Sequence, residues 1–303
     1  MVCAFQGWND AGDAASAALQ FVGASLGATR FARIDPEEFF DFQATRPKVK
    51  LNDAQVREIE WPEVEIFAAR VPRAPRDLVL ISGAEPSMRW QTFTQLIIDL
   101  AEALGTQLVV SLGALLADVP HSRPVGITGL SSDPSLTDRL NLHPTSYEGP
   151  TGIVCVLHDA CTRAGLPTVS LWASVPHYVA AAPNPKAALA LVRNLEQLVG
   201  VSVDAQELES QAGDYERQVN LAVQSDPDVQ AFVERLEQAV EEEEAGEPDP
   251  DVPSGDVLAR EFQRFLRQRG SDSPGGLSNP TTLLKEERER ADACRRWRAG
   301  WTG

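Results

Sequence analysis

The chain has 303 residues, with 27 Lys and Arg against 44 Asp and Glu, for a formal net charge of −17. This acidity does not suit a nucleic-acid-binding protein, which usually presents a basic surface. No apolar run reaches the roughly 18 to 20 residues that span a bilayer. Four cysteines, at 3, 155, 161 and 294, do not form a disulfide framework. We therefore expect a soluble, cytoplasmic protein with no nucleic-acid or membrane partner.

The charge is concentrated in one segment of the chain. Residues 204–251 hold 16 acidic and 2 basic residues, whereas residues 1–203 hold 21 and 15, and residues 252–303 hold 7 and 10. We expect a basic partner to bind the acidic segment. The composition divides the chain into an α/β domain at 1–203, an acidic helical hairpin at 204–245, a linker at 246–255, a helix at 256–270 and a disordered tail at 271–303.

Strand-like and helix-like patterns alternate through the first 200 residues. Strands are predicted at 2–6, 64–71, 77–82, 107–112, 125–130 and 168–173, and helices at 91–104, 153–163 and 186–199. Another helix begins at a cap formed by Asn9 and Asp10 and ends near Ser25, before Gly27. Strands separated by helices of roughly 10 to 15 residues predict a mostly parallel sheet covered on both faces.

The acidic segment shows two helical patterns joined by a short turn at 224–227. Apolar residues recur at helical spacing on the second helix, at Val229, Phe232, Val233, Leu236 and Val240. We therefore predict an antiparallel hairpin of two helices that serves in binding or oligomerisation.

The chain begins inside its first predicted strand, whereas a sheet strand normally follows another segment. We therefore expect that an upstream segment is missing from this sequence. No basic region followed by an apolar run precedes the strand, so we expect no signal peptide.

Six glycine-rich and polar clusters recur at the carboxyl ends of the predicted strands, which is where open α/β sheets bind ligands. These clusters predict a shared pocket or interface, although the same residue types also form ordinary turns. The candidate binding residues are Trp8, Asn9, Asp10, Asp13, Glu85, Trp90, Pro120, His121, Gly149, Pro150, Thr151, Trp172, His177 and Tyr178. The aromatic members could be core residues, walls for a stacked ring or anchors of a protein interface.

Four of these residues are candidate catalytic groups, namely Asp10, Glu85, His121 and His177. Each also has a structural explanation, as a helix cap, a buried acceptor or a hydrogen-bonded loop histidine. The sequence lacks a P-loop, a GxGxxG turn after a strand, a GxSxG elbow and a zinc-type ligand spacing. We expect no metal and no cofactor.

Taken together and in this order, the clusters resemble the proteasome assembly chaperone 2 family in its bacterial branch. The similar segments are 7–15, Glu85-Pro86 with Trp90, Leu112-Gly113 with Pro120-His121, 149–153, and Trp172 with Pro176-His177-Tyr178. The similarity covers roughly residues 2 to 200, and the acidic hairpin looks like the extension of actinobacterial members.

The resemblance implies a three-layer α/β/α domain of the phosphorylase/hydrolase-like type that self-associates, with trimers as the expected state. It also implies relatives that hold proteasome α-subunits during ring assembly. The chain ends in Gly300-Trp301-Thr302-Gly303, which departs from the proteasome-docking tail of archaeal relatives. We therefore expect a non-enzymatic assembly factor that forms homo-oligomers and binds proteasome subunits. The alternative is an enzyme with a nucleoside-like or carboxylate-amine ligase-type pocket at the strand ends.

Overall fold

A computed structural model describes the chain except for residues 53–54, 73, 134–135, 138–146, 180–182 and 245–303. The predicted linker, the helix at 256–270 and the tail lie outside the described residues. One compact unit begins at Met1 and ends at Pro248, so the acidic helices belong to the same unit as the sheet. The domain division at residue 203 stays a prediction.

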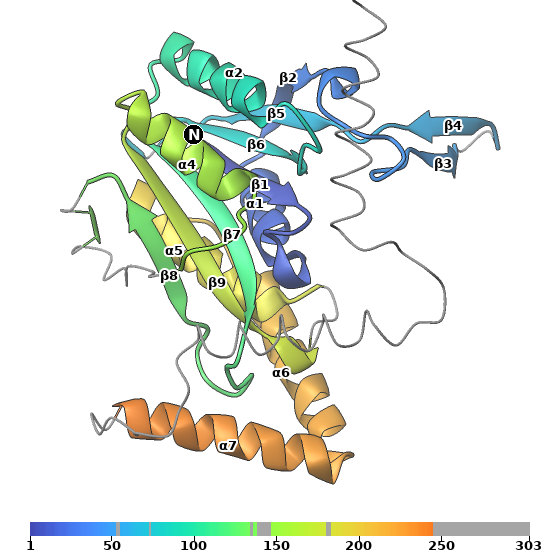
Figure 1. The fold of residues 1–303 in the computed structure, drawn as a ribbon, viewed down its shortest axis with the longest axis vertical. Coiled ribbons are helices and arrows are strands. Elements are labelled where there is room, and N and C mark those ends of the chain that lie inside the picture. Colours follow the sequence, from blue (N-terminus) through green and yellow to red (C-terminus); the bar gives the residue numbers. More distant parts are fainter. Residues whose placement is uncertain (53–54, 73, 134–135, 138–146, 180–182, 245–303) are drawn as a thin grey trace, which may run out of the picture. The chain divides into compact units, whose positions relative to one another are not determined.

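Seven strands form the central sheet in the order β2-β5-β6-β1-β7-β9-β8 (Figure 1). Their bounds are Thr29–Ile34 for β2, Val64–Ala69 for β5, Leu78–Ala84 for β6, Val2–Gln6 for β1, Val109–Ala117 for β7, Thr168–Pro176 for β9 and Ile127–Ser131 for β8. The four central strands are parallel, as predicted for this sheet, whereas β2, β5 and β8 run antiparallel to their neighbours. The sheet is therefore mixed.

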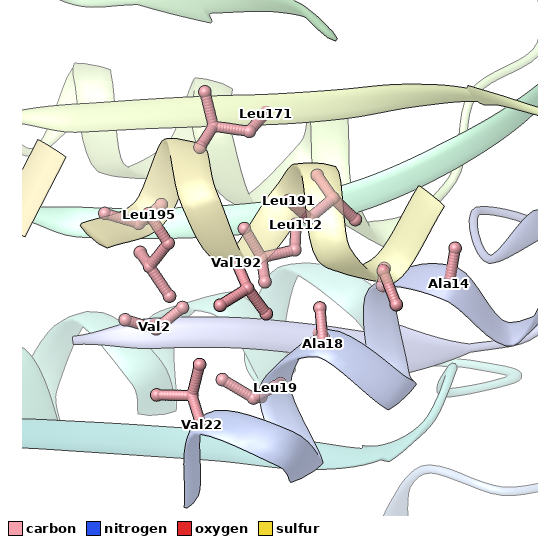
Figure 2. Packing of buried hydrophobic residues seen from close by; sticks show 14 of the residues in the cluster. Val2, Ala14, Ala18, Leu19, Val22, Leu112, Leu171, Leu191, Val192 and Leu195 are labelled. Carbon is pink, nitrogen blue, oxygen red and sulfur yellow. The ribbon is translucent and has the colours of Figure 1, made fainter. Parts of the chain in front are cut away.

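Helices cover both faces of this sheet, which confirms the α/β architecture. On one face, α1 (Ala14–Ser25) and α5 (Pro185–Val199) bury small and branched side chains, and Figure 2 shows Ala18, Leu19 and Val192 among them. On the other face, α2 (Trp90–Ala103) and α4 (Ile153–Arg163) enclose a second core. Helix boundaries agree with the sequence to within a few residues, because glycine or a cap residue ends most of the periodic runs.

Two further helices follow the α/β core. α6 (Gln206–Gln224) packs against α5, where Arg193 pairs with Glu209. α7 (Pro227–Glu244) follows after a short turn, as predicted, and its Val233 packs with Val219 and Val223 of α6. Figure 1 shows α7 splayed away from α6 rather than running back along it. None of the described helices is long and apolar enough to cross a membrane.

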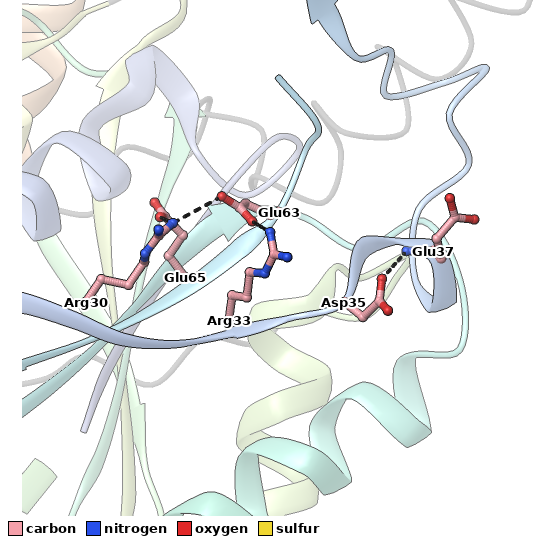
Figure 3. A network of polar contacts seen from close by, with 6 residues as sticks. All are labelled: Arg30, Arg33, Asp35, Glu37, Glu63 and Glu65. Carbon is pink, nitrogen blue, oxygen red and sulfur yellow. Dashed lines mark hydrogen bonds and ion pairs between the residues drawn. The ribbon is translucent and has the colours of Figure 1, made fainter. Parts of the chain in front are cut away.

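Three strands were not predicted from the sequence. β2 lies at an edge of the sheet, and β3 (Lys48–Leu51) and β4 (Arg57–Glu60) form a separate two-stranded ribbon. The backbone ladder holds β2 beside β5, and exposed ion pairs add to it: Arg30 contacts Glu65 at 2.5 Å and Arg33 contacts Glu63 at 3.2 Å (Figure 3). Charged side chains alternate with apolar ones in these strands, so they lack the long apolar run that identifies a central strand.

Candidate functional site

The parallel strands β6, β1 and β7 end at the same edge of the sheet, where a hydrogen-bonded network joins the loops after β6 and β1 to the start of α4. The Glu85 carboxylate oxygen Oε1 accepts a bond of 2.8 Å from the Asn9 side-chain amide and another of 2.8 Å from the Ile153 backbone N–H. Ile153 is the first residue of α4, so the carboxylate also lies at the positive end of a helix. Glu85 therefore ties together the ends of β1 and β6 and the start of α4.

Gly152 makes this junction possible. A Cβ atom at this position would lie 2.0 Å from the Asn9 amide nitrogen and 2.5 Å from its oxygen. Asn9 is buried, with 2% of its surface exposed, and cannot swing out into solvent. A glycine directly before α4 is thus required by the close approach of the Asn9 side chain.

Asp10 is a buried helix-capping residue. Its Oδ1 accepts hydrogen bonds from the backbone N–H groups of Ala15 at 2.7 Å and Ser16 at 3.2 Å, while its Oδ2 is buried without a partner. Burial raises the pKa of the Asp10 carboxyl, although the bonds to Ser16 and Ala15 oppose this shift. Asp13 is exposed and adopts a left-handed backbone conformation at the start of α1.

His121 is the centre of a second network, between the β7–β8 loop and α6. Its Nδ1 lies 2.8 Å from the Tyr178 hydroxyl and its Nε2 lies 3.1 Å from the Asn220 carbonyl oxygen. Its backbone N–H donates to the same hydroxyl at 2.7 Å, and its backbone oxygen accepts from Lys186 at 2.5 Å. Lys186 in turn pairs with Glu216 of α6 at 2.6 Å.

These partners fix the tautomer of His121. The Asn220 carbonyl can only accept, so Nε2 carries the proton and Nδ1 accepts a bond from the Tyr178 hydroxyl. Both ring nitrogens are thereby satisfied in a side chain that is 4% exposed. Burial raises the pKa of Tyr178 to about 12, so its hydroxyl stays protonated and can donate. In this arrangement His121 holds the loop to α6.

The loop after β7 also contacts α7. Ser122 bonds to Glu237, and Arg123 pairs with Glu241 at 2.5 Å. His177 pairs with Asp118 at 2.8 Å, and its ring lies edge-on to Phe232 of α7 with centroids 5.4 Å apart. This set of contacts holds the acidic helix against the strand ends.

A cavity beside His121 is too small for an organic ligand. It is lined by residues of the β7–β8 loop together with Asn184, Lys186 and Tyr215, and its volume of about 10 Å³ is roughly that of one water molecule. Pockets that hold drug-sized ligands measure about 300–1,000 Å³. We therefore assign no substrate to this cavity.

The candidate catalytic residues divide between these networks. Asp10 and Glu85 are bonded near α1 and α4, and His121 and His177 are bonded near α6 and α7. Within the described part of the chain, no hydrogen bond joins any two of the four side chains, and no group of three or more metal-ligating residues occurs.

The predicted aromatic and loop residues differ in their exposure. The Trp8 side chain is 64% exposed next to buried Asn9, whereas Trp90 and Trp172 are half-buried. The Trp90 indole N–H donates to the Pro86 carbonyl at 2.5 Å, and the Trp172 ring covers Gly113. Pro120 is buried, whereas Gly149, Pro150 and Thr151 are exposed before α4.

Sequence reasoning missed several residues at this edge. Leu115 and Leu116, at the end of β7, are 40% and 52% exposed. Ala114 directly before them donates its N–H to the Asn9 oxygen at 2.8 Å, which brings the Trp8 loop beside β7. In the sequence the two leucines continue the apolar run of this strand, so the pattern predicts that they are buried rather than exposed. Asn184, which caps α5 through Ala187 at 3.0 Å, stood directly before Pro185 and could have been recognised as a cap.

Comparisons with known proteins identify close relatives. The family model described as the PAC2 family matches residues 4–223. A PAC2 family protein from Streptomyces avermitilis is 49% identical, with a TM-score of 0.72, and the match covers 77% of this chain and 98% of that one. The proteasome-assembly chaperone homologue of Mycobacterium tuberculosis is 43% identical, with a TM-score of 0.71 and the same coverage of 77% and 98%.

More distant structures share the fold. An archaeal proteasome activator from Pyrococcus furiosus is 15% identical with a TM-score of 0.59, over 73% of this chain and 92% of that chain. A search of curated proteins found no match. Since the family model covers most of the chain and the two actinobacterial structures match it at more than 40% identity, the chain belongs to the PAC2 family.

Proposed function

We propose that this protein is a non-enzymatic, homo-oligomeric assembly factor that binds proteasome subunits in the cytoplasm. One observation carries the proposal: the chain is 43% identical to the proteasome-assembly chaperone homologue of Mycobacterium tuberculosis over 98% of that chain. The free cysteines among the described residues, Cys3, Cys155 and Cys161, fit a reducing compartment.

The carboxyl edge of the sheet is the surface that we assign to the subunit. Trp8, Leu115 and Leu116 expose apolar surface there, and the loop that carries Trp8 is fixed by buried Asn9 and the Glu85 network. Exposed tryptophans on a rigid base are typical hot spots of protein interfaces, because little conformational freedom is lost on binding. The geometry supports an enzyme less well than an interface, because each of the four candidate catalytic side chains is bonded to a loop or a helix that it holds in place.

The test is capture of proteasome subunits by the full tagged chain, expressed in a proteasome-containing actinobacterial host. We expect recovery of α-subunits and at least a roughly 30-fold weaker interaction for Trp8→Ala, since truncation of a hot spot costs about 2 kcal/mol or more. Leu104→Ala is the matched control, because Leu104 is 47% exposed at the end of α2, away from the proposed surface. Recovery of no proteasome subunit, or equal binding by Trp8→Ala, contradicts the proposal.

The enzyme alternative has its own test. A thermal-shift screen of the same protein with nucleosides and nucleotides reports any ligand that binds the folded state, because binding raises the unfolding temperature. A reproducible concentration-dependent shift that Glu85→Gln or Asp10→Asn abolishes would favour an enzyme.

A further inference from the structure

The ribbon formed by β3 and β4 stands apart from the seven-stranded sheet. The two strands pair only with each other within the described part of the chain. Figure 1 shows the ribbon projecting away from the sheet beyond β5. A two-stranded ribbon is at best marginally stable alone in water, so an additional partner would stabilise it.

One face of the ribbon carries three exposed apolar side chains beside Arg57. The register places Val49 opposite Ile59 and Leu51 opposite Arg57, and these four side chains share a face because residues alternate along a strand. Val49 is 64% exposed, and Leu51 and Ile59 are each 59% exposed. A cluster of this kind on a projecting arm marks an interaction surface rather than a random exposure of single residues.

Among the described residues, the backbone of these same positions has no partner strand outside the ribbon. The Asn52 N–H donates to the Val56 oxygen at 3.0 Å, so this pair is hydrogen-bonded across the ribbon. In an antiparallel ladder, hydrogen-bonded and non-bonded pairs alternate, so the pairs Leu51–Arg57 and Val49–Ile59 are non-bonded. The backbone N–H and C=O groups of these four residues therefore point away from the ribbon, along the outer edge of β3 for Val49 and Leu51 and along the outer edge of β4 for Arg57 and Ile59.

The charges on the opposite face determine which edges can join. β3 carries Lys48 and Lys50 there, and β4 carries Glu58 and Glu60, with Lys50 and Glu60 paired at 2.5 Å within the ribbon. Two copies of β3 side by side would oppose lysines, and two copies of β4 would oppose glutamates, which is destabilising. Pairing β3 of one copy with β4 of the next opposes lysine with glutamate and keeps the apolar faces on one side.

We infer that the ribbon joins copies of this chain head to tail, with the β3 edge of one copy paired antiparallel with the β4 edge of the next. This inference rests on the proposed self-association and assigns its surface. A two-fold contact pairs a surface with itself, so a pairing of two different edges closes into a ring only with three or more copies. The apolar faces that carry Val49, Leu51 and Ile59 then gather around the axis of the ring.

The test is the molar mass of the full chain, measured by size-exclusion chromatography with light scattering. We expect at least three times the chain mass of 32.9 kDa. Ile59→Pro removes an outward N–H without removing a bond inside the ribbon, and V49D/I59D places carboxylates on the apolar face. Both variants should fall to the mass of a single chain. Leu104→Asp introduces a single carboxylate at an exposed leucine elsewhere, 47% exposed, and should keep the wild-type mass.

The outcomes separate this inference from the proposed function. A wild-type monomer contradicts both the proposed self-association and the ribbon contact. A wild-type dimer, or a larger wild-type assembly whose mass stays unchanged in Ile59→Pro and in V49D/I59D, overturns the ribbon contact and leaves self-association standing. Circular dichroism of each variant verifies that the α/β core is folded, and because Val49 and Ile59 are exposed we expect wild-type spectra.

Discussion

Replacement of Gly152 by alanine tests whether the Glu85 network holds the carboxyl edge together. The backbone of Gly152 is extended, with φ of −110°, so alanine can adopt it and the effect is steric. The new Cβ would lie 2.0 Å from the Asn9 amide nitrogen, and the buried amide must leave its position. Loss of its bond to the charged Glu85 costs about 1.5–3 kcal/mol and local overpacking about 1–3 kcal/mol. We therefore expect Gly152→Ala to destabilise the fold by about 3–5 kcal/mol.

The assay is urea-induced unfolding followed by circular dichroism, with the free energy obtained by linear extrapolation. Gly126→Ala is the matched control, because a Cβ there has the Ser174 hydroxyl oxygen as its nearest neighbour at 3.9 Å. Its unfolding free energy should stay within about 0.5 kcal/mol of the wild type.

A double variant identifies the clash itself. Asn9→Ala alone loses the bond to Glu85 and should cost about 2 kcal/mol. Once Asn9 is truncated, the Cβ at position 152 no longer meets an amide, so the double variant should cost about as much as Asn9→Ala alone. If the two costs add, or if Gly152→Ala lies within about 1 kcal/mol of the wild type, the explanation for this glycine is wrong.

Four further substitutions test the surrounding contacts. Tyr178→Phe leaves the His121 backbone N–H without a partner and should cost about 1–3 kcal/mol in the same unfolding assay, whereas an unchanged midpoint would contradict the network. Lys186→Met removes a charge that bonds the His121 carbonyl and a glutamate of α6; we expect a loss of about 1–3 kcal/mol, and no loss would show that α6 is held by other contacts. Arg33→Ala removes an exposed ion pair and should cost less than about 1 kcal/mol, so a larger loss would reveal a structural role for the β2 edge. Burial raises the folded-state pKa of Asp10 above its ordinary 3.8, so its contribution to stability is complete below that value and declines as pH rises through the folded-state pKa. Asp10→Asn keeps an acceptor for the helix and does not titrate, so it should gain stability relative to the wild type as pH rises above 3.8, and a difference that stays constant with pH would contradict the shift.

The sequence predicted the core elements because their signals are local. The apolar run of β6, the cap at the start of α1 and the periodicity of α4 and α5 each depend on neighbouring residues, and the structure confirms these elements. The direction of the outer strands could not be predicted from neighbouring residues. An antiparallel β8 beside β9 depends on how the connecting loops pack, which no short pattern of residues records.

The candidate residues show the same division. The residue types at the strand ends predicted that Asp10, Glu85 and His121 lie at one edge of the sheet. The hydrogen-bond partners of each side chain became evident only from the structure. Partners such as Asn220 and Lys186 come from helices more than 60 positions away from His121. Their polar side chains look like ordinary helix-surface residues in the sequence, so only the packing of α6 could assign them.

By itself, the sequence determined the α/β architecture, the approximate positions of the core helices and the segment where negative charge is concentrated, since composition and periodicity act along the chain. Only the tertiary structure decided that Gly152 must lack a side chain, that Trp8 and Leu116 are exposed, and that β3 and β4 form a ribbon separate from the seven-stranded sheet. These features depend on atoms brought together from distant positions. Burial and close approach are properties of the folded chain, and no local pattern of residues specifies them.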